Sequence, residues 1–230
     1  NIIPGTPIAY WISQHYMDAF SKGTLLGQLA DSKQGLATSD NNRFCRLWFE
    51  VEAPAIKFDA RNEDDALTSQ KKWFPYNKGG EFRKWYGNRD YVINWENDGY
   101  SIRHNFKNGR LAIRPQNTQY NFVENISYSS LTIGALSFRH YIGFINDQAG
   151  NYFVPNSKFP TMVALALLNS VVAPYCISLK NSTLNTTAED FKAIPCKKLD
   201  NDVNDNIIFI AQNNEELSKK DWDSFETSYD

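Results

Sequence analysis

The sequence predicts a mixed α+β fold: a β-rich middle with an N-terminal helix, a packed helix near residues 160–175 and an acidic C-terminal helical tail. Near the N-terminus, apolar side chains recur at the three-to-four-residue spacing of one helix face. The middle holds short β-branched and aromatic runs that are separated by Asn, Asp and Gly. An Ala-, Leu- and Val-rich run follows, and carboxylates concentrate near the C-terminus.

The first predicted helix covers residues 7–21. Pro7 suits its first turn and Gly23 suits its end. The leucines of residues 25–29 predict a second short helix or turn. Polar residues 31–34 then lead into the β-rich middle.

The middle of the chain reads as short strands. Residues 91–95 combine Tyr, Val, Ile and Trp, and the Asn-Asp-Gly that follows predicts a turn. The acidic residues 62–69 are expected to form a loop, and residues 147–151 look like a hairpin turn. The other predicted strands are 44–48, 50–58, 120–126, 131–138 and 140–145.

A second helix is predicted over residues 162–175, capped by Thr161 and with Pro174 at its far end. A polar segment and a short, half-apolar segment follow. The acidic tail from Asn201 carries a helical pattern over residues 203–217.

Composition excludes several classes of protein. The 230 residues are 42% apolar, enough for a substantial core. No run approaches the ~20 apolar residues of a membrane span, and no signal peptide is visible. The three cysteines are far apart in the sequence, which favours reduced thiols. We therefore expect a cytoplasmic protein without a membrane partner.

The charges are segregated along the chain. Residues 71–114 hold ten Lys/Arg and four Asp/Glu, whereas residues 189–230 hold five Lys/Arg and eleven Asp/Glu. These regions, at +6 and −6, cancel within a total net charge of −2. A basic middle of this kind suits a polyanionic partner, although the two regions could instead pair with each other across the fold.

No motif for catalysis, cofactor binding or metal binding is apparent. Phosphate-cradling glycine loops, Cys-x-x-Cys pairs and nucleophile elbows are all missing. His15 is expected to pack, because it lies beside an apolar helical face. His104 and His140 are isolated in the sequence.

Residues 71–88 form the most unusual segment, which we call the basic–aromatic segment. It combines five Lys/Arg with six aromatic side chains. Cations for phosphates and flat rings for bases fit a nucleic-acid surface. Alternatively, the aromatic residues belong to the core of a structural hairpin and the lysine heads reach solvent along its edge.

Residues 35–48, beginning Gly-Leu-Ala-Thr-Ser-Asp-Asn-Asn-Arg-Phe, resemble the start of a target-recognition region in adenine-specific DNA methyltransferases. The chain looks most like the PglX-type methyltransferase of BREX phage-defence systems. The basic–aromatic segment and its continuation to residue 99 resemble that family's most distinctive segment. Residues 3–11, 167–170, 183–185, 190–195 and 220–227 extend the resemblance over nearly the whole chain. Ser39 departs from it, because the family usually has Gly there.

The resemblance implies the role of a DNA target-recognition domain. The family's Asn-Pro-Pro-Tyr/Phe motif and cofactor loop are not in this sequence. The chain would therefore lie downstream of a catalytic domain that transfers a methyl group from S-adenosylmethionine to adenine. We expect no cofactor in this segment itself. The implied division is a helical connector (1–34), the recognition domain (35–196) and an acidic, partly helical tail or the start of a further helical region (197–230).

Double-stranded DNA is the implied partner. Lys and Arg would contact phosphates and base edges, and Asn suits adenine, so that Asn77 and Asn88 are additional candidates. The predicted DNA-binding residues are Thr38, Asn41, Asn42, Arg43, Arg46, Lys71, Lys72, Lys78, Arg83, Lys84 and Arg89.

Two other functions stay open. In a carbohydrate-binding module, the rings of Trp73, Tyr76, Trp85 and Tyr86 would stack on sugars. In a protein-interaction scaffold, the acidic tail would dock another subunit, such as a phage-defence protein, with Trp222 and Phe225 as anchors.

Overall fold

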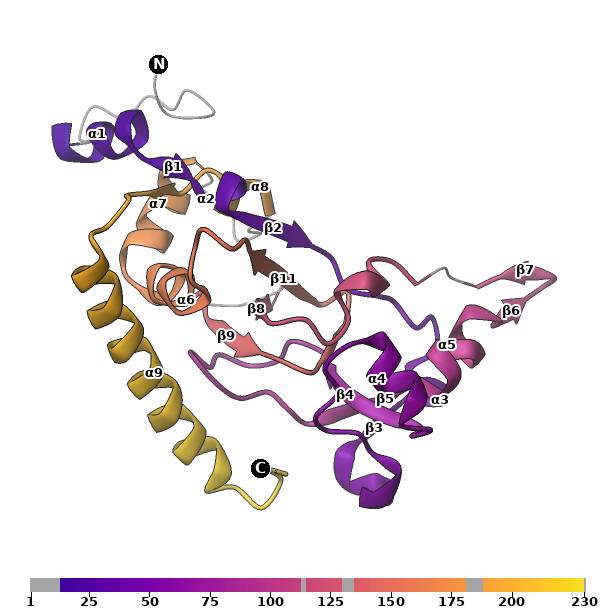
Figure 1. Ribbon diagram of the computed structural model, residues 1–230. Coiled ribbons are helices and arrows are strands. Elements are labelled where there is room, and N and C mark those ends of the chain that lie inside the picture. The colour runs from indigo at the N-terminus through magenta and orange to yellow at the C-terminus, as the bar shows by residue number, and fades with distance from the viewer. Residues whose placement is uncertain (1–12, 113–114, 130–134, 181–187, 230) are drawn as a thin grey trace.

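The computed structural model describes residues 13–112, 115–129, 135–180 and 188–229. The predicted α+β class and the C-terminal helix are confirmed. Two four-stranded sheets form the centre of the molecule. The long helix α9 (Asn201–Asp223) runs along one side, and a small hairpin projects on the opposite side (Figure 1).

The first sheet has the strand order β10-β4-β5-β3. Strands β3 (Cys45–Leu47), β4 (Trp73–Asn77) and β5 (Tyr91–Asn94) pair antiparallel, whereas β10 (Ile145–Asn146) pairs parallel to β4. Buried aromatic and aliphatic side chains from this sheet form one core. Around it lie α3 (Asn41–Phe44), α4 (Glu63–Thr68) and α5 (Glu96–Arg103).

The second sheet has the order β2-β11-β8-β9 and is fully antiparallel. Its strands are β2 (Ala30–Lys33), β8 (Asn125–Ser129), β9 (Phe138–Tyr141) and β11 (Gly150–Pro155). A second core joins it to α6 (Thr161–Asn169), α7 (Val172–Lys180) and α8 (Ala188–Lys192).

Smaller elements complete the fold. Helices α1 (Gln14–Lys22) and α2 (Leu26–Leu29) flank β1 (Thr24–Leu25), which pairs with β12 (Pro195–Cys196). Strands β6 (Phe106–Lys107) and β7 (Arg110–Leu111) form the projecting hairpin. Short 3₁₀ turns cover Trp48–Glu50, Ala53–Ala55 and Thr118–Tyr120.

The N-terminal predictions hold only in part, because Ser13 is the extended cap before α1, and His15, which was expected to pack, is exposed. Helix α1 ends at Gly23, which caps it, and α2 is the predicted short helix. Residues 7–12 lie outside the described part of the chain. No element is predicted for the polar residues 31–34, and most of them form β2 at the edge of a sheet.

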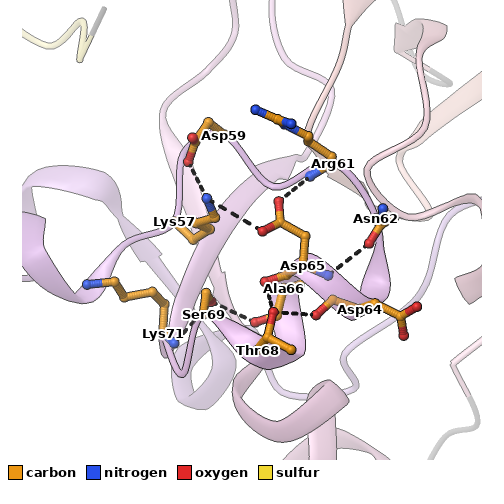
Figure 2. Close-up of polar contacts among 10 residues, drawn as sticks. All are labelled: Lys57, Asp59, Arg61, Asn62, Asp64, Asp65, Ala66, Thr68, Ser69 and Lys71. Atoms are coloured by element: carbon orange, nitrogen blue, oxygen red, sulfur yellow. Dashed lines mark hydrogen bonds and ion pairs between the residues drawn. The ribbon is translucent and has the colours of Figure 1, made fainter.

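The prediction of a loop over residues 62–69 is also wrong, because this segment is α4. Asn62 Oδ1 accepts a hydrogen bond from the Asp65 amide at 2.8 Å, as Figure 2 shows. Three carboxylates occupy the first turn, where the helix dipole stabilises negative charge. Lys57 lies 3.8 Å from Asp65 of that turn and 2.8 Å from nearby Asp59, so its positive charge offsets part of the repulsion among the carboxylates.

Several strand boundaries differ from the prediction. Residues 50–58 form no continuous strand: Ala53–Ala55 is a 3₁₀ turn, and Ile56 makes an isolated β-bridge to Trp73. Strand β8 begins only at Asn125, and β9 and β10 are separated by Gly143 at φ 78°. Residues 130–134, part of another predicted strand, lie outside the described residues. Residues 147–151 do turn, but β10 and β11 belong to different sheets and form no hairpin.

The predicted helix over residues 162–175 is two helices. Helix α6 ends at Asn169, and α7 starts at Val172 after a bend of 65°. Thr161 is the first helical residue rather than the cap, and Pro174 lies in the first turn of α7, where its missing N–H costs nothing. The helical tail is longer than predicted, since α9 covers 23 residues.

Among the described residues, no single helix is long and apolar enough to cross a membrane. Helices α6 and α7 meet that test only as a bent pair, and only by length and composition.

The two sheets are linked by buried polar side chains. Asn77, at the end of β4, donates hydrogen bonds to Ser127 Oγ in β8 at 2.7 Å and to Asn146 Oδ1 at 2.8 Å. Its Oδ1 accepts from the Gly79 amide. Asn77, a candidate for reading adenine, is therefore fully buried and ties the sheets together.

Candidate functional site

The basic–aromatic segment contributes its rings to the interior. Trp73, Phe74 and Tyr76 in β4 are buried, as is Tyr86, and Trp85 packs partly buried against the second core. Phe82 is the exception, with 57% of its surface exposed. The interpretation of these aromatic residues as core is confirmed, although the segment is a strand and a loop rather than a hairpin.

Three cations near the end of that segment are held by the chain itself. Arg83 pairs with Asp221 of α9 at 2.8 Å and lies over the Trp222 ring. Lys84 Nζ donates to the Asn169 carbonyl oxygen at 2.8 Å. Arg89 is buried, donates to the His140 carbonyl oxygen and stacks 3.8 Å from the Tyr86 ring centroid.

Lys71 is likewise engaged. Its Nζ donates to the Pro54 carbonyl oxygen at 2.6 Å, and its amide donates to Ser69 Oγ at the end of α4. In Figure 2 the Lys71 side chain points away from the carboxylates of α4. The Lys71 head is therefore held by a main-chain carbonyl rather than by a carboxylate of α4.

The turn before α3 holds the first group of predicted residues. Buried Thr38 donates to Asn41 Oδ1 and accepts from the Asp40 amide, and Asp40 in turn caps α3. Ser39 has φ 59°, the left-handed conformation that favours glycine. The family's usual Gly at this position therefore has a physical reason. Asn42 is exposed, and its carbonyl oxygen accepts from Arg46.

Four predicted cations lie around α3 and β3, a region that we call the α3 surface. Arg43 is exposed and donates to Asn105 Oδ1 at 3.2 Å. Arg46 and exposed Lys72 both lie against the Trp73 ring, at 6.0 and 5.6 Å from its centroid. Lys78 is 3.5 Å from Asp147. Arg46 and Lys72 thus share one ring, and Arg46 and Lys78 both lie near Cys45, whereas Arg83, Lys84 and Arg89 are held by other parts of the chain.

A buried thiol lies beneath these cations. Burial raises the pKa of Cys45 to about 11, and the charges of Lys78 and Arg46 oppose that rise only in part. The thiol also contacts Asn41 Oδ1 at 3.8 Å. Cys45 is therefore a neutral packing residue at pH 7 and not a nucleophile.

The sequence analysis missed the hairpin that adjoins the α3 surface. Asn105, at its base, donates to Ser39 Oγ at 3.3 Å, and Lys107 Nζ donates to the Ser39 carbonyl oxygen at 3.0 Å. Its turn is Asn108-Gly109, with both residues at positive φ. This dipeptide is a strong hairpin signal that would have located the element.

The acidic helix α9 lies against the basic segment, so the two charged regions pair in part. His140, isolated in the sequence, lies 2.7 Å from Glu215 and 2.9 Å from Glu124. Burial alone would lower the pKa of His140, but the hydrogen bonds to both carboxylates outweigh it and raise the pKa to about 9. The hydrogen bond from His140 in turn lowers the pKa of Glu124. Trp222, an expected partner anchor, is buried against the chain itself.

The described residues include no cluster of three or more His, Cys, Asp or Glu side chains that could hold a metal ion.

No protein-family model matches the chain. It is 33% identical over 231 residues to the adenine-specific methyltransferase PglX of Lacticaseibacillus casei (strain Zhang), covering 99% of this chain and 19% of that protein. It is 36% identical over 232 residues to the adenine-specific methyltransferase BrxX of Escherichia coli O9:H4 (strain HS), covering 99% of this chain and 18% of that protein. The resemblance to PglX-type methyltransferases is thus confirmed: this chain is similar, over nearly its whole length, to a segment that makes up about a fifth of two such proteins.

Proposed function

We propose that this chain is the DNA-recognition part of an adenine-specific DNA methyltransferase in a bacterial defence system. The observation that carries the proposal is the α3 surface, where Arg43 and Arg46 lie close to exposed Asn41 and Asn42, and Lys72 shares the Trp73 ring with Arg46. Cations suit phosphates, and Arg and Asn suit guanine and adenine edges. The names of the two similar proteins support a methyltransferase as the parent.

The chemistry would belong to the parent protein. S-adenosylmethionine would bind outside this segment, and a flipped adenine would be methylated there while this chain holds the flanking duplex. The outer face of α9 would be free to dock further defence subunits, since Phe209 and Ile210 are exposed on it. We place the parent in the cytoplasm, where its DNA substrate is found.

The cations that the chain engages internally take a secondary role in this proposal. Arg83, Lys84 and Arg89 hold the loop after β4 in position. Lys71 is held in a similar way, by the Pro54 carbonyl oxygen. Thr38 acts through Asn41, which it orients for contact with DNA.

The test is a titration of the chain with duplex DNA at increasing salt. If about four to six phosphates are engaged, log K should fall with log salt at a slope of about −4 to −5. Arg43→Ala and Lys72→Ala should each weaken binding, whereas Lys220→Ala on α9 should not. Absence of binding at low salt, or equal effects of all three substitutions, would contradict the proposal.

A carbohydrate-binding function finds less support. Three of the four rings that would stack on sugars, Trp73, Tyr76 and Tyr86, are buried. Trp85 packs partly buried against the second core. A glycan titration alongside the DNA titration tests this alternative directly.

A further inference from the structure

The hairpin β6–β7 lies within a stretch of unusual charge. Residues 99–123 include Arg103, Lys107, Arg110 and Arg114 and no Asp or Glu. The hairpin projects from the body of the molecule at the end of α5 (Figure 1). It is the most outlying described element on this side. Among the residues that the structure describes, no carboxylate pairs with Lys107 or Arg110, whereas Asp221 pairs with Arg83 and Asp147 with Lys78.

The hairpin is built as a rigid ribbon. Lys107 pairs with Arg110, Phe106 pairs with Leu111, and the Ala112 amide donates to the Asn105 carbonyl oxygen at 2.7 Å. Asn108 at φ 51° and Gly109 at φ 74° form a two-residue turn whose twist matches the strands. A side chain built at Gly109 would meet no atom within 4 Å, so the tip stands in open space.

The two faces of this ribbon differ. Side chains alternate along a strand, so paired Lys107 and Arg110 share one face and Phe106 lies on the other. The Lys107 head reaches the Ser39 carbonyl oxygen, which turns the cationic face toward the α3 surface. Arg110 is exposed, and within the described part of the chain no hydrogen bond or ion pair is made by its guanidinium. Phe106 is 61% exposed.

We infer that this hairpin enters the major groove of duplex DNA beside the α3 surface, with Arg110 directed at base edges and Lys107 at a phosphate. The inference rests on the proposed function and extends it. A two-stranded ribbon fits the width of the major groove, and an arginine there is the favoured partner of guanine O6 and N7. Asn105 fixes the geometry, because its carboxamide joins the hairpin base to both Arg43 and Ser39.

The experiment compares the full chain with three variants, using a mixed-sequence oligonucleotide duplex. Lys107→Ala with Arg110→Ala should weaken binding by about five-fold or more and reduce the magnitude of the salt slope by about one to two. Arg43→Ala serves as the α3-surface variant, and Lys220→Ala, whose side chain is 68% exposed on α9, is the matched control. Thermal melting should be unchanged for the hairpin variant, since both side chains are exposed.

Dimethyl sulfate footprinting then shows whether the protein contacts the major groove of the DNA. Wild-type protein should protect guanine N7, which faces the major groove, and Arg110→Ala should lose that protection. If wild-type protein binds no DNA, the proposed function fails, and this inference with it. If wild-type binds and Arg43→Ala weakens binding while the hairpin variant binds like wild-type, only the hairpin inference is overturned. Binding without N7 protection also overturns it.

Discussion

Asn169 ends α6 and completes the hydrogen bonding of β9 from the side. Its Oδ1 accepts from the Phe138 amide at 3.0 Å, and its Nδ2 donates to the Phe138 carbonyl oxygen at 2.9 Å. Its own carbonyl oxygen accepts from Lys84. A single buried asparagine therefore joins α6 to β9 through its carboxamide and to the basic–aromatic segment through its main-chain carbonyl.

Asn169→Asp should destabilise the fold by about 1–3 kcal/mol, because the nearly isosteric carboxyl loses the donor that pairs with the Phe138 carbonyl. Urea unfolding measures the free energy. Asn156→Asp is the matched control, since Asn156 also donates to a main-chain carbonyl, that of Gln28, but is exposed. Equal losses in the two variants would contradict this account of Asn169.

Ser39 supports a second prediction at the residue scale. At φ 59°, a β-branched residue is strained much more than Ser, whereas Gly is not strained. Ser39→Val should therefore be less stable than Ser39→Gly by about 1–3 kcal/mol. Thermal melting of both variants tests this, and equal melting temperatures would show that the turn can relax to negative φ.

At the scale of single elements, helix α6 contributes buried side chains to the second core. Leu165 and Leu168 are fully buried, whereas Leu167 is only partly buried. A run that is apolar on all sides does not reveal which side faces the sheet. The structure resolves this by placing α9 along the helix.

Leu165→Ala should cost about 2–5 kcal/mol in the free energy of unfolding, and Leu167→Ala distinctly less, because the partly buried site leaves a smaller cavity. Chemical denaturation of both variants measures the difference. A larger loss for Leu167→Ala would mean that α6 is rotated from the orientation described.

Local signals in the sequence account for much of the fold. Gly23, Asn97-Asp98-Gly99 and residues 91–95 lie where their patterns predict an end, a turn and a strand. The helix cap at Asn62 and the turn at Asn108-Gly109 could also have been predicted, because each depends only on neighbouring residues in the sequence. The sequence could not predict which of the DNA-binding candidates pair internally. Arg83, for example, pairs with Asp221, which lies 138 residues away in the sequence. Such a partner follows only from the tertiary packing of α9.

At the scale of the whole molecule, an ion pair holds α9 against the second sheet. His140 in β9 lies between Glu124 and Glu215, and its pKa is raised to about 9 from the ordinary value near 6.5. Because the folded protein binds this proton more tightly than the unfolded chain, the stabilisation is fully present below about pH 6.5. It is lost as the pH rises through about 9.

The melting temperature should therefore fall between about pH 6.5 and 9.5, and Glu215→Gln should make this fall shallower. Buried thiols also titrate near this range once unfolded, so the difference between wild-type and Glu215→Gln isolates the histidine. Glu216→Gln is the control, because Glu216 is exposed and pairs only with Lys220 among the contacts described for it. Identical pH profiles for wild-type and Glu215→Gln would contradict this role of His140.

The strand order also has a consequence for synthesis on the ribosome. In the first sheet β4 pairs with β10, and in the second β2 pairs with β11, so the partners are about 70 and 120 residues apart in sequence. The first sheet cannot close until Asn146 has left the exit tunnel, and the second cannot close until Pro155 has done so. Until then the nascent chain presents open strand edges and unburied aromatic residues, which invite aggregation. Chains released before residue 155 should accumulate as insoluble protein, whereas those released after α8 retain every strand of both sheets.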